Sequence, residues 1–210
     1  MTTDTRYEQL DAVFGGVTKS ARCAEKHRRT LEEVIQLGVE IAREGREGRK
    51  IGTLFVVGDV ERTLQHSRAL LLDPLYGHPP ELLHVSRPDF RETVKELAQL
   101  DGAFLVAGDG TFAAAARYID VDPGTPLLPG LGARHAAGAS ISAATDAISI
   151  VVSQSSVVRV FADGEVRAEI IPELFLLSGQ ELFTRDASVR RLPDVGLTLA
   201  VANGDERAAG

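Results

Sequence analysis

The sequence predicts an α/β fold: a single domain with a mixed, mostly buried β-sheet flanked by helices. Three observations lead to this prediction. Short, nearly all-apolar runs, typical of strands buried on both faces, recur along the chain. Segments with apolar residues at helical spacing separate these runs. Finally, Asp163-Gly164 lies between two apolar runs and is a strong hairpin signal, so part of the sheet is expected to be antiparallel.

Each predicted element has its own local signal. Two helices open with a Thr or Asp three residues before a Glu, the pattern of a capping box; the pairs are Thr30 with Glu33 and Asp89 with Glu92. The first helix is expected to end at the glycines of 45–48, and the second near Leu100. Further helices are predicted over the small-residue segment 133–144 and over 172–183. Buried strands are predicted over residues 51–57, 103–106, 147–153, 157–161 and 165–171.

The length of the chain suits one sizeable domain with short terminal extensions. Residues 1–29 are expected to form a helical N-terminal extension, and residues 30–185 the domain. Residues 186–210 are expected to form a frayed C-terminal tail. No internal repeat or low-complexity tract divides the domain further.

The composition excludes several classes of function. A net charge of −7 argues against binding to nucleic acid or membrane surfaces, which requires a basic face, but allows a nucleotide as ligand. The single cysteine, Cys23, excludes an intrachain disulfide and a cysteine-built metal site. No apolar run approaches the roughly 20 residues that span a bilayer, and the first residues lack the layout of a signal peptide. We therefore expect a cytoplasmic protein without nucleic-acid or membrane partners.

Two glycine-containing segments resemble phosphate-binding loops. Residues 45–53 have the composition of a P-loop but the wrong order, because the lysine is not followed by Ser or Thr and the segment precedes a strand. Gly108-Asp-Gly-Thr-Phe-Ala113 matches the dinucleotide fingerprint G-x-G-x-x-A. That match would make the chain a small NAD(P)-dependent oxidoreductase with a helix over 111–118. Asp109-Gly110 also suits a hairpin turn, and no strand with a ribose-binding acid follows, so we favour the hairpin.

A third glycine-containing segment, Gly130-Leu-Gly-Ala-Arg-His135, leads into the predicted helix 133–144. Glycines before a helix turn backbone N–H groups and the positive end of the helix toward an anion. Arg134 adds a bidentate phosphate donor, and His135 adds another donor beside it. The small residues of the helix would allow close approach of a nucleotide or a partner subunit. By itself, the segment also fits a loop packed against a tightly packed helix.

Asp101 and Ser153 lie at the ends of predicted elements. Asp101 sits between a helix and a strand, and Gly102 after it permits close approach of the backbone. Ser153 ends the apolar run Ile150-Val-Val-Ser153. Each residue alone is typical of an ordinary turn, cap or strand end.

Taken in order, these segments resemble the diadenylate cyclase domain, which is also found at the N-terminus of the DNA-integrity scanning protein DisA. The chain is most similar to the archaeal-type branch of that family. The resemblance spans roughly residues 30–171. The segments that carry it are Glu44–Gly58, Asp101-Gly-Ala103, Leu131-Gly-Ala-Arg-His135, Thr145-Asp-Ala147 and Ile150-Val-Val-Ser153.

The resemblance implies a DisA N-terminal-like fold and a nucleotidyl transfer reaction. Two ATP molecules are joined into cyclic di-AMP, as the ribose 3′-OH of one attacks the α-phosphate of the other and pyrophosphate leaves. The implied catalytic residues are Asp101, Arg134 and His135. The residues expected to contact ATP are Gly102, Ala103, Gly132, Ala133, Arg134, His135 and Ser153. Asp101 is also the expected metal ligand, and oxygen-rich ligands favour Mn²⁺ or Mg²⁺.

Two further expectations follow from the resemblance. The product is two-fold symmetric and the chain carries one set of signatures, so a homodimer or higher homo-oligomer with facing active sites is expected. In addition, Ala133, Ala136 and Gln154 replace a Thr, an Arg and a Glu that many family members carry. These replacements leave open a second interpretation, in which the same fold is a catalytically degraded sensor that binds ATP or cyclic di-AMP.

Overall fold

The structure, a computed structural model, describes residues 27–125, 130–172, 187–192 and 197–202. Its helices are α2 (Arg28–Glu44), α3 (Val60–Gln65), the 3₁₀ helix η2 (Pro80–Leu82), α4 (Pro88–Leu97) and α5 (Ala133–Ala144). Its strands are β1 (Thr53–Val57), β2 (Ser67–Ala69), β3 (Ala103–Val106), β4 (Phe112–Ile119), β5 (Ile148–Val152), β6 (Val158–Ala162), β7 (Glu165–Ile171), β8 (Ala187–Leu192) and β9 (Leu197–Ala202). Within the described part of the chain, no helix is both long and apolar enough to cross a membrane.

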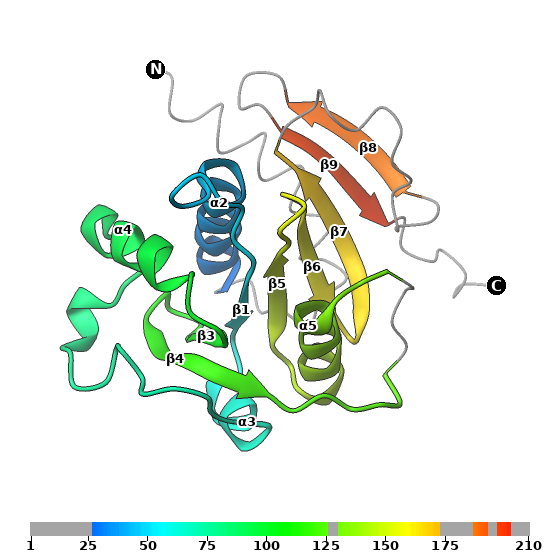
Figure 1. The fold of residues 1–210 in the computed structure, drawn as a ribbon. Coiled ribbons are helices and arrows are strands. Elements are labelled where there is room, and N and C mark those ends of the chain that lie inside the picture. The colour runs from blue at the N-terminus through cyan, green and yellow to red at the C-terminus, as the bar shows by residue number, and fades with distance from the viewer. Residues whose placement is uncertain (1–26, 126–129, 173–186, 193–196, 203–210) are drawn as a thin grey trace.

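The strands form one nine-stranded sheet in the order β2-β4-β3-β1-β5-β6-β7-β9-β8 (Figure 1). The sheet is mixed, as predicted, because β1 pairs in parallel with β3 and antiparallel with β5. β6 and β7 form the predicted hairpin, with Asp163 and Gly164 at positive φ angles of 54° and 80° in its turn. The predicted fold class, a mixed sheet flanked by helices, is confirmed.

Helices cover both faces of the centre of the sheet (Figure 1). Phe55 and Val57 of β1 belong to one hydrophobic cluster, which includes residues of α2 and α4. Leu54 and Val56 belong to a second cluster, which includes Ala139 and other residues of α5. Because side chains alternate between the faces of a strand, α2 and α4 lie on one face and α5 on the other. All of β1 is buried as a result.

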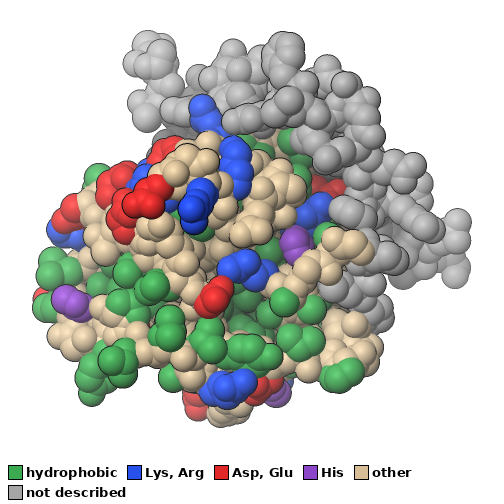
Figure 2. Space-filling model, in the orientation of Figure 1, with side chains coloured by type: hydrophobic (Ala, Val, Ile, Leu, Met, Phe, Trp, Pro, Cys, Tyr) green, Lys and Arg blue, Asp and Glu red, His purple; other side chains and the backbone are tan. Residues whose placement is uncertain are grey.

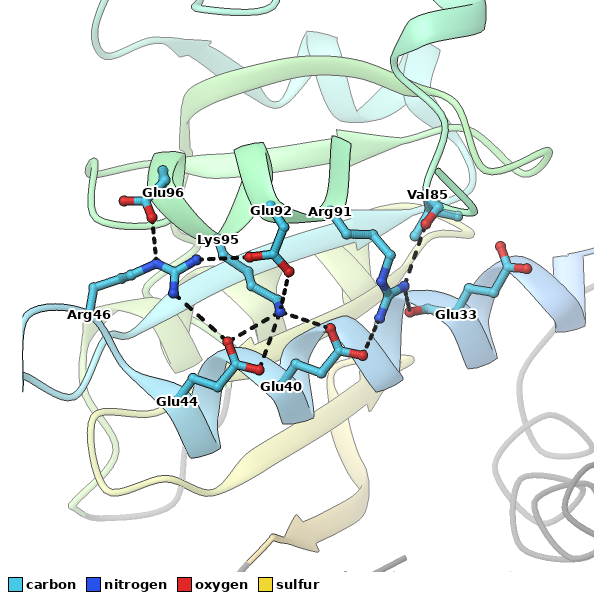
Figure 3. A network of polar contacts seen from close by, with 9 residues as sticks. All are labelled: Glu33, Glu40, Glu44, Arg46, Val85, Arg91, Glu92, Lys95 and Glu96. Carbon is cyan, nitrogen blue, oxygen red and sulfur yellow. Dashed lines mark hydrogen bonds and ion pairs between the residues drawn. The ribbon is translucent and has the colours of Figure 1, made fainter. Parts of the chain in front are cut away.

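A network of ion pairs joins α2 to α4 (Figure 3). Lys95 of α4 is its centre: the ammonium Nζ lies 2.8 Å from Glu92, 3.2 Å from Glu44 and 3.3 Å from Glu40. The guanidinium of Arg91 pairs with Glu40 at 2.6 Å. Only 7% of the Lys95 side chain is exposed, so the network holds α4 against α2 and thereby positions the chain that enters β3.

The two predicted capping boxes are wrong. α2 begins at Arg28, and Thr30 lies inside it, where its hydroxyl donates to the Gly108 carbonyl at 2.9 Å. This half-buried partner in a distant loop competes with the local capping bond, and the helix extends past Thr30 toward the N-terminus. α4 begins at Pro88, because a proline at the first helical position loses no helical hydrogen bond. Asp89 therefore lies in the first turn instead of capping it.

The segment 108–113 is a hairpin, as we favoured. The Ala107 N–H donates to the Thr111 carbonyl at 2.8 Å, and the Gly110 N–H donates to the Ala107 carbonyl at 3.0 Å. Phe112–Ile119 is strand β4, paired antiparallel with β3, so the helix that a dinucleotide fingerprint requires is not formed. The oxidoreductase interpretation is therefore wrong. Gly110 instead permits close packing, since a Cβ there would lie 2.8 Å from Nε2 of His84.

Part of the segment predicted as a C-terminal tail belongs to the sheet. β8 and β9 pair with each other, and β9 pairs with β7, so a frayed tail is the wrong description of residues 187–192 and 197–202. The helix predicted over 172–183 falls almost wholly outside the described residues, as does the N-terminal extension up to residue 26. The division into extension, domain and tail remains a prediction.

Candidate functional site

Segments far apart in the sequence meet at the end of the central strands where β1 and β3 begin. β1 and β3 are parallel, and β5 is antiparallel to β1 and therefore ends there. This side of the sheet, formed by strand ends and not by an outer strand, is called the edge below. Asp101 lies just before β3 and Ser153 just after β5. Arg134, in the first turn of α5, reaches Asp101 and the loop that enters β1. The structure thus gathers three of the predicted site residues at the edge.

Asp101 and Arg134 form an ion pair. Arg134 Nη2 donates to Asp101 Oδ1 at 3.0 Å, although the two residues are 33 apart in the sequence. The Asp101 side chain is 78% exposed and the Arg134 side chain is 36% exposed. An exposed pair of this kind contributes only about 0–1 kcal/mol to stability, so both groups are able to exchange partners when a ligand arrives.

Gly52 makes room for the Arg134 guanidinium. A Cβ at Gly52 would lie 3.2 Å from Arg134 Nη1, 3.2 Å from the Val152 carbonyl oxygen and 3.3 Å from Gln154 Cγ. Arg134 therefore lies against the backbone that enters β1 and beside the end of β5. Gly52 is not one of the predicted site residues, although it lies within the segment Glu44–Gly58 that carries the resemblance.

Gly102 is required by the backbone. Its φ angle is +106°, and a Cβ there would lie 2.7 Å from the carbonyl carbon of Ala116. Ala116 itself has a positive φ of 51°, in a stretch of β4 where the register with β3 shifts. The glycine thus lets β3 begin directly beside this irregular strand. Ala103, the next residue, is buried in the core and places only its backbone near the edge.

The N-terminus of α5 has no side-chain cap. Gly132 is the N-cap residue and Ala133 the first helical residue, so neither provides a side-chain oxygen for the free N–H groups. A Cβ at Gly132 would meet nothing within 4 Å. Further along the helix, Gly138 allows α5 to pack closely on β5. The Ser149 hydroxyl of β5 donates to the Gly138 carbonyl at 2.7 Å. An open helix N-terminus of this type suits an anion.

His135 faces the sheet and is buried, with 6% of its surface exposed. The guanidinium of Arg159 in β6 lies 3.2 Å from its Nε2 atom. Arg159 also pairs through Nε with Glu169 of β7 at 2.6 Å, and both of these side chains are buried. Burial, with the positive charges of Arg159 and Arg134, lowers the pKa of His135 to about 4. His135 is therefore neutral near pH 7.

Ser153 forms the turn between β5 and β6. Its N–H donates to the Val157 carbonyl at 2.9 Å, and its carbonyl accepts from the Ser156 N–H at 2.9 Å. Its hydroxyl lies 2.9 Å from the Ser155 hydroxyl. Gln154, between the two serines, approaches Gly52 with its side chain. Because the Arg134 guanidinium also lies against Gly52, this turn is close to Arg134.

Arg159 and Glu169 are the residues that the sequence analysis missed. The available signal was a charge inside an apolar strand: Arg159 interrupts Val157–Phe161, and Glu169 precedes Ile170-Ile171. Charged side chains are almost never fully buried unless they are paired. Two such residues on the arms of one hairpin therefore indicate a buried pair, and the register places Arg159 opposite Glu169.

On the face seen in Figure 2, acidic and basic side chains gather over α2 and α4, and hydrophobic side chains gather in the lower half.

Among the described residues, no group of three His, Cys, Asp or Glu side chains is placed to hold a metal ion. A cation at Asp101 would therefore take its other oxygen ligands from a bound ligand and from water.

Comparisons with known proteins show which family the chain is similar to. A profile of the DAC family, described as DisA bacterial checkpoint controller nucleotide-binding, matches residues 40–166. A diadenylate cyclase from Methanocaldococcus jannaschii is 43% identical over 154 residues, which cover 73% of this chain and 49% of that protein. A diadenylate cyclase from Haloferax volcanii is 35% identical over 147 residues, which cover 69% of this chain and 54% of that protein. The chain thus spans about half the length of the curated relatives it matches.

A solved structure supports the fold alone. It is titled as a hypothetical membrane spanning protein from Bacillus cereus, and it matches with a TM-score of 0.50 at 20% sequence identity. The match covers 65% of this chain and 61% of that chain.

Proposed function

The chain belongs to the DAC family of nucleotide-binding domains, and on this premise we propose that it is a diadenylate cyclase, which condenses two ATP molecules into cyclic di-AMP and two pyrophosphates. The resemblance found in the sequence is thereby confirmed at the level of the family, and both relatives are archaeal. A cytoplasmic location, where ATP is abundant, is part of the proposal.

The observation that carries the proposal is the Asp101–Arg134 pair beside the uncapped N-terminus of α5. The reaction needs a group that accepts the proton of a ribose hydroxyl and groups that stabilise negative charge on a phosphate. A carboxylate and a guanidinium 3.0 Å apart supply both at one place. Because the pair is exposed, its opening costs little.

Each residue has a defined role in the proposed transfer. Asp101 orients the attacking 3′-OH and accepts its proton as the bond from O3′ to the α-phosphorus forms and the bond to the pyrophosphate oxygen breaks. Arg134 and the N–H groups at Gly132 and Ala133 bind the phosphates, where the negative charge is concentrated. The Ser153 hydroxyl, in the turn beside Arg134, binds a phosphate oxygen.

A divalent cation fits this donor set. Asp101 is an exposed carboxylate, and Mg²⁺ in nucleotide sites is commonly held by one or two carboxylates together with phosphates. We propose that Asp101 holds Mg²⁺ or Mn²⁺ together with the phosphates of ATP. The cation would neutralise the leaving pyrophosphate.

Two copies of the site must meet to make a two-fold symmetric product. We propose that two chains face each other, each holding one ATP, in an isologous dimer or a larger assembly of dimers. Exposed hydrophobic surface on the described residues supports a covered face: Leu72 and Tyr76 are 96% and 89% exposed. Cyclase activity that rises in proportion to enzyme concentration in a strictly monomeric sample would contradict this arrangement.

The test is incubation of the protein with ATP and Mg²⁺ or Mn²⁺, followed by mass spectrometry for cyclic di-AMP. We expect product from the wild type and a loss of about 100-fold or more in Asp101→Asn. Asp89→Asn is a matched control, because Asp89 also forms an exposed pair with an arginine, Arg87, at 2.7 Å. Bound ATP without product under either metal would reject the cyclase in favour of the sensor. Ala133, Ala136 and Gln154 would then be the first positions to restore.

A further inference from the structure

The buried hydrogen-bond chain behind the site determines which nitrogen of His135 carries the proton. Arg159 Nη1 lies 3.2 Å from His135 Nε2. A guanidinium has five N–H donors and no acceptor. A hydrogen bond between these two atoms therefore requires a lone pair on Nε2, and the proton of the neutral imidazole must sit on Nδ1.

Arg159 is itself held in place. Its Nε donates to Glu169 Oε1 at 2.6 Å, a short charge-assisted bond between neighbouring strands β6 and β7. The side chains are 6% and 0% exposed, respectively. The remaining strands against α5 near His135 are β1 and β5, whose sequences Thr53–Val57 and Ile148–Val152 contain no ionisable residue. Among the described residues, Arg159 contacts the ring, Glu169 pairs with Arg159, and Arg134 precedes His135 on α5. The other charged residues of β7, Glu165 and Arg167, pair with each other at 3.1 Å near the β6–β7 turn.

We propose that Arg159 and Glu169 are positioning residues that hold His135 as a neutral imidazole with its proton on Nδ1, so that the residue after Arg134 at the start of α5 is a neutral hydrogen-bond donor and not a second cation. This inference rests on the proposed function for its consequence, but the state of the ring is a property of the free protein. The low pKa of His135 agrees with the geometry, because burial and two neighbouring guanidinium groups oppose a positive charge.

The proposal assigns different outcomes to two substitutions of similar size. The side-chain nitrogen of Asn occupies about the place of Nδ1 in a histidine, whereas the amide of Gln reaches the place of Nε2. We therefore expect His135→Asn to retain more cyclic di-AMP synthesis than His135→Gln, by about 10-fold, which one hydrogen bond is worth. Equal losses in both variants, or better retention in Gln, would contradict the assignment of the proton to Nδ1.

The direct test is nuclear magnetic resonance of the ATP-free protein labelled with ¹⁵N at histidine, because the shifts of the two ring nitrogens identify the tautomer. The His135 signals are assigned by their loss in His135→Asn, and the exposed rings of His66 and His78 are references in the same spectra. We expect a neutral ring with protonated Nδ1 from pH 8 to pH 5. A proton on Nε2, or a cationic ring at pH 7, would overturn the proposal.

A double variant separates positioning from simple support of the fold. Arg159→Met with Glu169→Met removes both charges together, and replacing a buried ion pair by apolar residues often leaves stability unchanged or increased. In this variant the pKa of His135 should rise, the preference for the proton on Nδ1 should weaken, and kcat for cyclic di-AMP should fall. An unchanged ring and unchanged kcat in the folded variant would show that the pair is only structural.

The spectra keep this inference separate from the proposed function. If the wild type makes no cyclic di-AMP, the cyclase proposal fails while the tautomer measurement in the free protein still stands or falls by itself. If the double variant does not fold, the wild-type spectra still decide the state of His135.

Discussion

The Arg134 guanidinium donates a 3.0 Å hydrogen bond to the Asp101 carboxylate and so links the start of α5 to the start of β3. In the free protein each group neutralises the other. On ATP binding the guanidinium is expected to turn to phosphate and to release the carboxylate for the ribose hydroxyl. The pair therefore keeps the carboxylate and the guanidinium at the same edge, and breaking it costs little free energy because both groups are exposed.

Arg134→Met should reduce kcat/KM for cyclic di-AMP by about 100-fold or more, because it removes a charged donor to the phosphate. Arg134→Lys should recover only part of this loss, since an ammonium does not reproduce the planar, bidentate geometry. Thermal unfolding should change little in either variant, because the Asp101 pair is exposed. Arg87→Met, which breaks a comparable exposed pair on α4, is the control for general loss of charge.

Gly52→Ala should impair ATP binding more than folding. The added methyl group would lie 3.2 Å from Arg134 Nη1 and 3.3 Å from Gln154 Cγ, both in flexible side chains that are able to move aside. It would also lie 3.2 Å from the backbone carbonyl oxygen of Val152, a contact that a shift of a few tenths of an ångström relieves. The guanidinium would then leave the position it needs for phosphate. We expect an ATP dissociation constant about 10-fold higher by titration calorimetry and a loss of stability of about 1 kcal/mol. A large loss of stability with normal ATP affinity in the folded fraction would assign Gly52 to the fold alone.

Gly102→Ala should instead destabilise the fold. At φ +106° an alanine is strained, and its Cβ would lie 2.7–2.8 Å from backbone atoms of Ala116 and Arg117, which have no freedom to move within the sheet. We expect a loss of about 3 kcal/mol or more in denaturant unfolding. Gly132→Ala is the control, because a Cβ there meets nothing within 4 Å, and it should cost at most about 1 kcal/mol. Similar stabilities of the two variants would contradict this distinction.

Local sequence predicted the elements well where burial is two-sided or a turn is chemically specific. The apolar run 103–106 matches β3 from end to end, and the small-residue segment 133–144 matches α5. Asp163-Gly164 predicted the β6–β7 hairpin, because few other residue pairs tolerate two consecutive positive φ angles. These features depend on neighbours in the chain, and sequence periodicity reports such neighbours directly.

Contacts between distant segments could not be predicted in this way. The partner of Thr30 is the Gly108 carbonyl, 78 residues away, and no local pattern indicates it. The addition of β9 to the edge at β7 likewise depends on pairing between distant strands. The meeting of Asp101 and Arg134 follows from the order of strands in the sheet, and before the structure only the resemblance to a family indicated it.

Lys95→Met should destabilise the junction between α2 and α4. The substitution leaves Glu40, Glu44 and Glu92 facing one another without the ammonium that lies 2.8–3.3 Å from them. Because only 7% of the lysine side chain is exposed, we expect a loss of about 2 kcal/mol in denaturant unfolding at neutral pH. Arg87→Met, in an exposed pair of the same helix, should cost less than about 0.5 kcal/mol.

The contribution of His135 to the stability of the wild type should rise with pH between about 4 and 6.5. His135 has a pKa of about 4 in the folded protein, against an ordinary value of 6.5. Between these values the unfolded chain binds a proton that the folded protein does not, so acid favours unfolding, and below pH 4 the effect of this residue levels off. The difference corresponds to at most about 3 kcal/mol. His135→Asn should flatten the pH dependence of denaturant unfolding in this window, and an unchanged slope would show that His135 titrates normally in the folded protein.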